Sequence, residues 1–177
     1  MLTVSTARVA AADRMIYFRE TPVVSLGALA MVATTTAWSP ILWEGGRRRK
    51  AGYLTSSFCG LDFDDGRWTL NDAIQTLKQN DLMGFVGTTK SHQRWKDGKP
   101  PCDRMRLVLV WDGAITDLRA YEQNMARMMA LTPADKACKD GGRYFWPCRE
   151  IVYLQDGDRQ PWAPYQAPPP RLRPTRR

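Results

Sequence analysis

The stretch Leu61-Asp62-Phe63-Asp64 alternates apolar and acidic residues with a period of two. Such a period is typical of a β-strand, because successive side chains of a strand point to opposite faces of the sheet. Leu61 and Phe63 are therefore expected in the core, and Asp62 and Asp64 on the opposite face with their carboxylates close together. Two carboxylates so placed repel each other unless a cation lies between them. The stretch thus predicts a central strand that carries an acidic pair.

Helical and extended patterns alternate on both sides of this strand. Apolar residues recur at helical spacing in 69–79, where Thr69 is a candidate N-cap, and again in 117–131. The apolar stretch 23–38 is expected to form a core helix followed by a strand. Further strands are expected at 57–63, 85–89 and 105–111, with short extended pieces near Tyr144 and Ile151 and a polar loop at 91–101. This order indicates an α+β domain with a mixed or antiparallel sheet.

The charge of the chain is distributed unevenly. The 177 residues carry 26 Lys and Arg against 18 Asp and Glu, a formal net charge of +8, and 44% of them are hydrophobic. This composition excludes a wholly disordered basic protein and favours nucleic acid or nucleotides as partners. Residues 161–177 hold six of the 12 prolines and four arginines but no acid. We therefore expect one domain over 1–160 and a disordered or polyproline-like tail, or linker, over 161–177.

The cysteines and the longest apolar stretch indicate a cytoplasmic protein. Cys59, Cys102, Cys138 and Cys148 show no CxxC spacing, so core thiols are favoured over a zinc site or disulfides. The stretch 23–38 is interrupted by a glycine and three threonines, and it is shorter than the ~20 residues that span a bilayer. We therefore expect no membrane partner and a location in the cytoplasm of a bacterium or a phage-infected host cell.

Two further groups of polar residues accompany the acidic pair. Lys90, Ser91 and His92 follow a short expected strand, and this combination of a cation, a hydroxyl and the only histidine suits the binding of a polyphosphate. Arg104 and Arg106 alternate at the next strand, so both are expected on one face, where they clamp phosphates or balance carboxylates. The hard carboxylate oxygens of the acidic pair suit Mg²⁺ or Mn²⁺.

Three motifs thus follow one another along the chain. The first is Asp62-Phe63-Asp64, the second is Thr89-Lys90-Ser91-His92-Gln93, and the third is Asp135 with Arg143-Tyr144-Phe145 after it. In this order they resemble the archaeo-eukaryotic primase (primase-polymerase) superfamily, above all the catalytic domain of its phage and plasmid members. That family carries a DxD or DxE motif on a strand, an SxH-like motif on a later strand and a third, isolated Asp. The resemblance runs over roughly residues 38–150.

The resemblance implies both a fold and a site. The implied fold is an RRM-like sheet packed with an N-terminal α/β unit, with the active site in the cleft between them. Two divalent cations, Mg²⁺ or Mn²⁺, are implied at Asp62, Asp64 and Asp135. The implied catalytic residues are these three aspartates and His92. The residues implied to hold the incoming nucleotide are Lys90, Ser91, His92, Arg104, Arg106 and Arg143.

The function that the resemblance implies is template-directed nucleotidyl transfer. The chain is then expected to be a DNA primase, and by extension a primase-polymerase, that serves the replication of a phage, plasmid or mobile element. Its expected partners are a single-stranded DNA template, nucleoside triphosphates and a replicative helicase supplied separately.

Two other functions remain open from the sequence. One is a non-catalytic replication-initiation module with the same fold, which binds DNA through its basic surface in a salt-sensitive manner that is indifferent to divalent metals. The other is an RRM-like RNA binder, whose sheet is expected to present stacking aromatics where this strand presents Asp62 and Asp64. The acidic pair favours catalysis over binding alone, because without a metal it repels a phosphate backbone.

Overall fold

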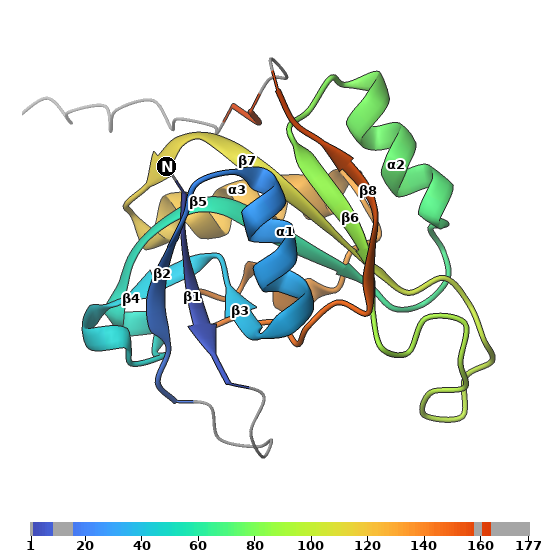
Figure 1. Cartoon of the computed structure of the whole chain (residues 1–177), viewed down its shortest axis with the longest axis horizontal. Helices are drawn as coiled ribbons and strands as arrows, with labels where there is room; N and C mark the ends of the chain where they lie inside the picture. The colour runs from blue at the N-terminus through green and yellow to red at the C-terminus, as the bar shows by residue number, and fades with distance from the viewer. Residues whose placement is uncertain (1, 9–15, 158–160, 164–177) are drawn as a thin grey trace, which may run out of the picture.

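Two antiparallel sheets and three α-helices form the computed structural model, which describes residues 2–8, 16–157 and 161–163 (Figure 1). The strands are β1 (Leu2–Ala7), β2 (Arg19–Val23), β3 (Ala37–Ser39), β4 (Ile41–Trp43), β5 (Tyr53–Phe63), β6 (Gly84–Thr88), β7 (Met105–Ile115) and β8 (Glu150–Gln155). The α-helices are α1 (Leu26–Thr35), α2 (Leu70–Gln79) and α3 (Leu118–Leu131), and the short 3-10 helices are η1 (Glu44–Gly46), η2 (Lys50–Gly52) and η3 (Lys136–Lys139). The expected α+β class with an antiparallel sheet is therefore confirmed.

The larger sheet contains the stretch that decides the fold. Its strand order is β4-β5-β7-β6-β8, and each neighbouring pair is antiparallel. Along β5 and β7, Leu61 pairs with Leu107 and Asp62 pairs with Arg106. Because β7 runs opposite to both of its neighbours, the carboxyl ends of β5 and β6 meet the amino end of β7 at one end of the sheet.

The predicted direction of Leu61 and Phe63 is confirmed, although Asp64 follows the last residue of β5. Leu61 and Phe63 are buried in the core. On the opposite face Gly60 approaches Phe145, and a Cβ atom built on Gly60 lies only 2.7 Å from that ring. A larger residue at this position therefore pushes the ring away from β5. The close approach holds the segment around Phe145 against the face of the sheet that carries Asp62.

The smaller sheet belongs to an N-terminal α/β unit. Its strand order is β2-β1-β3, and β1 contacts β4 of the larger sheet. Between β2 and β3 lies α1, which Ser25 caps at its N-terminus by accepting the N–H of Ala28. The helix and the strand expected within 23–38 are thus confirmed as α1 and β3. Neither β1 nor β2 was among the expected strands.

The helices α2 and α3 begin where the capping residues place them. Thr69 accepts the N–H of Asp72 and donates its own N–H to the Asp72 carboxylate, which is a capping box. Asp117 accepts the N–H of Ala120 at the start of α3. In Figure 1 α3 runs behind β5 and β7, and α2 lies beside β6, in agreement with their contacts.

The expected tail lies almost wholly outside the described residues. Residues 164–177 are not described, and the division of the chain after residue 160 stays a prediction. Just before them, the N–H of Trp162 donates to the carbonyl of Val110 at 2.7 Å, and the carbonyl of Trp162 accepts the N–H of Asp112 at 2.8 Å. The backbone at Trp162 is therefore attached to β7.

The described residues include all four cysteines and all the helices of the structure. No helix among those residues is long and apolar enough to cross a membrane. The four thiols are free, and Cys59, Cys138 and Cys148 are buried. Cys59 and Cys138 are core thiols, as expected, whereas Cys102 is only partly buried.

Candidate functional site

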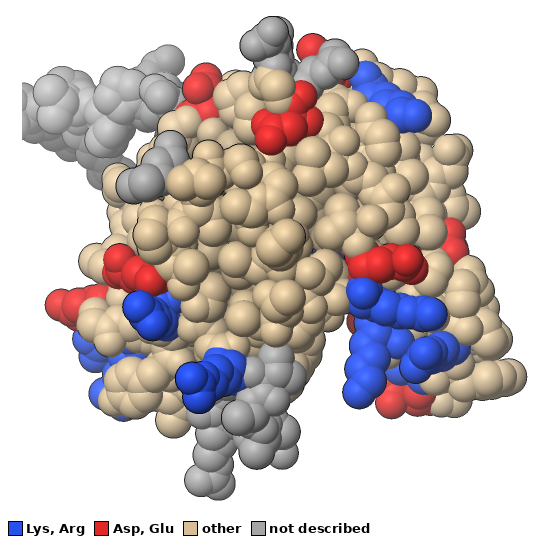
Figure 2. Space-filling view, in the orientation of Figure 1, with Lys and Arg blue, Asp and Glu red and all other residues tan. Residues whose placement is uncertain are grey.

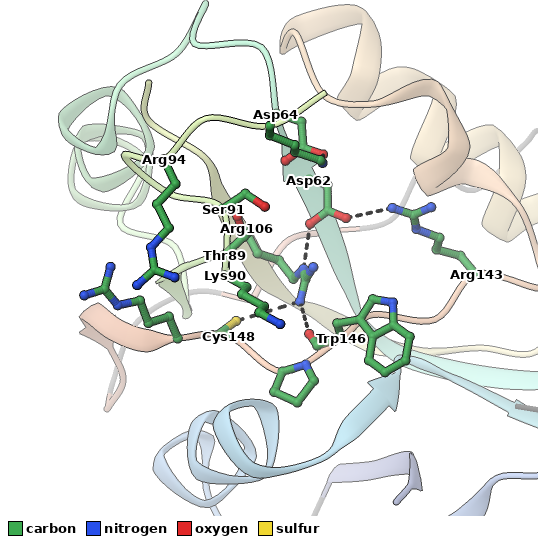
Figure 3. Close-up of a pocket in the computed structure, with 13 residues that line it drawn as sticks. Asp62, Asp64, Thr89, Lys90, Ser91, Arg94, Arg106, Arg143, Trp146 and Cys148 are labelled. Carbon is green, nitrogen blue, oxygen red and sulfur yellow. Dashed lines mark hydrogen bonds and ion pairs between the residues drawn. The ribbon is translucent and has the colours of Figure 1, made fainter. Parts of the chain in front are cut away.

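A pocket of about 800 Å³ opens at the end of the larger sheet where β5 and β6 end. Its wall combines residues from β5, from β7, from the loop after β6 and from the segment 143–149 that precedes β8. Figure 2 shows lysines and arginines gathered beside a cleft at the loop between β6 and β7, and Figure 3 shows the lining side chains. The lining residues are Asp62, Asp64, Thr89, Lys90, Ser91, Arg94, Lys96, Arg106, Arg143, Trp146, Pro147, Cys148 and Arg149. Six of these side chains are cationic and two are acidic.

Backbone hydrogen bonds hold the segment 143–149 across the sheet. The N–H of Phe145 donates to the carbonyl of Trp38 at 2.7 Å, and the N–H of Trp38 donates back at 2.9 Å. Farther along, the N–H of Arg149 donates to the carbonyl of Thr88 at 2.8 Å. This wall of the pocket is therefore fixed both to β3 and to β6.

Asp62 is bound by two arginines inside the pocket. Its side chain is 8% exposed, Arg106 Nε donates to Oδ1 at 2.6 Å, and Arg143 Nη2 donates to Oδ2 at 2.7 Å (Figure 3). Burial by itself raises the pKa of this carboxyl, but the two guanidiniums outweigh burial and hold the pKa below its ordinary value. Asp62 is therefore a carboxylate at neutral pH, and arginine balances its charge.

Arg106 connects Asp62 to the opposite wall of the pocket. The strand register places the two residues directly across from each other. The Nη1 atom of Arg106 also donates to the carbonyl of Trp146 at 2.6 Å, and the guanidinium carbon lies 4.4 Å from the centre of the Phe145 ring. Because the Arg106 side chain is only 6% exposed, it forms a buried ion pair and not a surface pair.

The backbone of Asp135 is hydrogen-bonded to that of Asp62, but Asp135 does not line the pocket. Its N–H donates to the carbonyl of Asp62 at 2.8 Å. Its Oδ1 accepts the N–H of Ala137 at 3.0 Å at the start of η3, and its Oδ2 lies 3.8 Å from Arg143 Nη2. The same nitrogen of Arg143 donates to Asp62. A guanidinium thus lies between two of the three carboxylates that the resemblance assigns to metal binding.

The arrangement of these acids does not fit the implied two-metal site. Asp64 accepts a hydrogen bond from Lys96 Nζ at 2.8 Å, so each of the three carboxylates has a basic neighbour. Among the described residues, no three or more His, Cys, Asp or Glu side chains are grouped so as to hold a metal ion. Mg²⁺ binds through carboxylates that are open to it. Metal binding stays an untested prediction, and we derive no chemical step from it.

Arg104 is buried under the loop between β6 and β7 and does not line the pocket. It is 0% exposed. Its guanidinium donates to the carbonyls of Asp64 (3.1 Å), Ser91 (2.8 Å), Arg94 (2.6 Å) and Pro100 (3.1 Å). The expected contact of Arg104 with phosphate beside Arg106 is not supported by this position, because Arg104 precedes β7 and its side chain turns into the loop. Arg104 is a positioning residue that fixes the loop to the end of β5.

His92 also lies outside the wall of the pocket. Its side chain is 12% exposed, and its Nδ1 accepts the N–H of Arg104 at 3.2 Å. The expected contact of His92 with nucleotide phosphates is not supported by this position. His92 instead helps to close the loop on itself.

Sequence reasoning located about half of the pocket wall. The expected site residues that line it are Asp62, Asp64, Lys90, Ser91, Arg106 and Arg143. It missed Arg94 and Lys96, although basic residues alternate along the polar loop 91–101 and could have served as a signal. It also missed Trp146 and Arg149. These two are placed by tertiary contacts of the segment before β8, for which the sequence shows no local pattern.

Comparisons with known proteins leave the family open. No protein-family model matches the chain, and no curated protein matches its sequence. Among solved structures, the chain is similar to the AEP domain of the primase-polymerase (PrimPol) of cyanophage S-2L, with 14% sequence identity and a TM-score of 0.47. The match covers 82% of this chain and 72% of that chain. The function of the pocket is therefore argued from its own geometry.

We expect Arg104→Met to loosen the loop between β6 and β7. In the wild type the amides of Thr89, His92, Gln93 and Arg94 donate to carbonyls of the loop or its flanks. Without the guanidinium, four carbonyls lose their buried donor, so these amides are expected to exchange about tenfold faster in hydrogen-exchange measurements. Arg119→Met, at an exposed position of α3, serves as the control. Unchanged exchange in Arg104→Met contradicts the positioning role.

We expect Arg106→Met to lower the free energy of unfolding by about 3 kcal/mol, since it leaves a buried carboxylate without one of its partners. Arg49→Met breaks the exposed pair with Glu44 and is expected to lower it by less than about 1 kcal/mol. Because the pKa of Asp62 is lowered in the folded protein, the stabilisation is present at neutral pH and is lost as the pH falls through that lowered pKa. Urea unfolding at neutral and acid pH measures both effects. Equal losses in the two variants contradict the account.

Proposed function

We propose that the chain binds a nucleotide in this pocket and holds it through its phosphate groups. The observation that carries the proposal is the charge of the wall, where six cationic side chains face two carboxylates that already have basic partners. Guanidinium and ammonium groups are the side chains that bind phosphate oxygens most strongly. A pocket of about 800 Å³ also lies within the range of sites that bind small ligands.

The loop after β6 supports the same reading. Thr89, Lys90 and Ser91 follow the end of β6 and line the pocket together with Arg94 and Lys96. Two hydroxyls and three cations thus come from one short segment. The fixed position of this loop over Arg104 makes these groups available to a phosphate chain without a large rearrangement.

Trp146 gives the pocket a surface for a base. Its side chain is 41% exposed and lines the pocket on the side opposite the loop (Figure 3). Its carbonyl accepts a hydrogen bond from Arg106, which fixes the backbone at this position. Bases stack on exposed aromatic rings, so phosphates on the cationic wall and a base on Trp146 fit one ligand.

Titration calorimetry with ATP tests this proposal. Arg149→Gln removes one cation from the wall and is expected to weaken ATP binding about tenfold, the effect of losing a charged hydrogen bond. Raising the salt concentration from about 0.05 M to about 0.5 M is expected to weaken binding further by screening. Arg119→Gln, outside this pocket, is expected to bind as the wild type does. Equal affinity of Arg149→Gln and the wild type contradicts the proposal.

A second candidate function is template-directed nucleotidyl transfer in the replication of a phage, plasmid or mobile element. The observation that favours it is the position of Asp62 and Asp64, whose carboxylates line the same pocket as Lys90 and Ser91. A single-stranded DNA template and a separately supplied helicase are the partners that go with this candidate. This candidate uses the same pocket as nucleotide binding, and it requires in addition that the bound nucleotide reacts.

A primer-synthesis assay on single-stranded DNA decides whether this reaction occurs. With ribonucleotides or deoxynucleotides and either Mg²⁺ or Mn²⁺, the second candidate predicts incorporation that Asp62→Ala abolishes. Asp65→Ala, which alters a neighbouring acid paired with Arg67 at the surface, is expected to keep it. Absence of incorporation by the wild type, with salt-sensitive DNA binding retained, leaves a binding module and refutes nucleotidyl transfer.

A further inference from the structure

We infer that this pocket binds phosphate without a divalent cation, and that Asp62 is a positioning residue that holds Arg106 and Arg143 for the ligand. The inference rests on the proposed function, because it concerns the same pocket and the same class of ligand. It departs from the two-metal arrangement that the resemblance implies. The hydrogen bonds that the aspartates already make are its basis.

Both oxygens of the Asp62 carboxylate already accept hydrogen bonds. The donors are guanidinium nitrogens, and the bonds are short, at 2.6 and 2.7 Å. Arg143 Nη2 also lies 3.8 Å from Asp135, in the space between two carboxylates where a bridging cation belongs. A guanidinium therefore already supplies the positive charge that a metal ion brings to such a group.

The cations of the pocket wall repel a metal ion. Arg106 and Arg143 hydrogen-bond to Asp62, and Lys96 hydrogen-bonds to Asp64, so a divalent cation bound to either carboxylate has these positive groups as close neighbours. Like charges at such distances disfavour each other strongly in a partly buried site. A phosphate group meets the same cations with the opposite sign of charge, so the wall favours the anion over the metal.

Two buried polar atoms of described residues that line the pocket lack hydrogen-bond partners. Among the described residues, Arg143 Nε and Thr89 Oγ1 are buried and form no hydrogen bond, and both residues line the pocket. Buried donors without partners are uncommon in folded proteins. An anion offers acceptors to an N–H and to a hydroxyl, whereas a metal ion offers none to the N–H. Small movements that open these atoms to a bound phosphate satisfy both.

The two arginines differ in exposure. Arg106 is 6% exposed and Arg143 is 26% exposed, and both line the pocket, so Arg143 presents more of its guanidinium to a ligand than Arg106 does. Asp62 accepts from both and fixes their directions relative to each other. Each oxygen of the Asp62 carboxylate accepts from one arginine, whereas the amide nitrogen of an asparagine accepts from none. The variant Asp62→Asn therefore keeps an acceptor for one arginine and removes the acceptor for the other.

The test uses inorganic tripolyphosphate as the probe and the full chain. Its affinity for the protein is measured by titration calorimetry, once in EDTA and once in Mg²⁺. We expect tripolyphosphate to bind in EDTA at least as tightly as in Mg²⁺. Mn²⁺ added without tripolyphosphate is expected to keep its free signal in electron paramagnetic resonance. Asp62→Asn is expected to weaken tripolyphosphate binding about tenfold although it removes a negative charge from the pocket, because the loss of a charged hydrogen bond has about that effect. The control Asp65→Asn is expected to leave binding unchanged.

The outcomes separate this inference from the proposed function. An affinity at least tenfold higher in Mg²⁺ than in EDTA, or Mn²⁺ bound by the wild type and lost in Asp62→Asn, overturns the inference and leaves nucleotide binding intact. Binding by Asp62→Asn as tight as or tighter than that of the wild type overturns the positioning role. Absence of binding in both EDTA and Mg²⁺ overturns the proposed function as well. Should Asp62→Asn fail to fold by circular dichroism, the wild-type comparison in EDTA and Mg²⁺ still decides.

Discussion

The buried ion pair between Asp62 and Arg106 is the constraint on which the rest of the site depends. The two residues face each other across β5 and β7, and neither side chain is more than 8% exposed. A charge so placed is tolerated only with a partner and further hydrogen bonds. Arg143 supplies the second bond to Asp62, and the carbonyl of Trp146 accepts from Arg106. The pair therefore dictates where the segment before β8 crosses the sheet, and with it one wall of the pocket.

The opposite wall depends on a second buried arginine. Arg104 directs its guanidinium to four carbonyls and thereby fixes the loop between β6 and β7 to the end of β5. The cationic side chains of that loop are presented to the pocket from a backbone that is already ordered. Arg106 thus acts mainly through its charge, and Arg104 acts through the hydrogen bonds that it donates to the backbone. Together they place phosphate-binding groups on both sides of one opening, with little ordering left to occur when a ligand binds.

Local patterns predicted the elements but only part of the site. The helical spacing after Thr69 and Asp117 predicts α2 and α3 nearly to the residue. The alternation at Leu61-Asp62-Phe63-Asp64 predicts the C-terminal part of β5, which begins four residues before the predicted start at residue 57. The strand β1 was not predicted although Leu2-Thr3-Val4-Ser5 alternates apolar and polar residues. The strand β2 carries no such alternation, and it is placed by its pairing with β1. The burial of the Arg104 side chain was not predictable from the alternation of residues, because it depends on the loop that covers this side chain. The contact of Asp62 with Arg143 joins residues 81 positions apart, so no local pattern encodes it.

In the proposed arrangement arginine, and not a metal ion, balances the charge of Asp62 while the pocket holds phosphate. A crystal structure of the protein grown with MnCl₂ and a nucleoside triphosphate tests it most directly, since manganese is located by its anomalous scattering. The account predicts phosphate density beside Arg106 and Arg143, with both hydrogen bonds to Asp62 kept and no anomalous peak within bonding distance of that carboxylate. A manganese peak bonded to Asp62, with Arg143 displaced from it, contradicts the account.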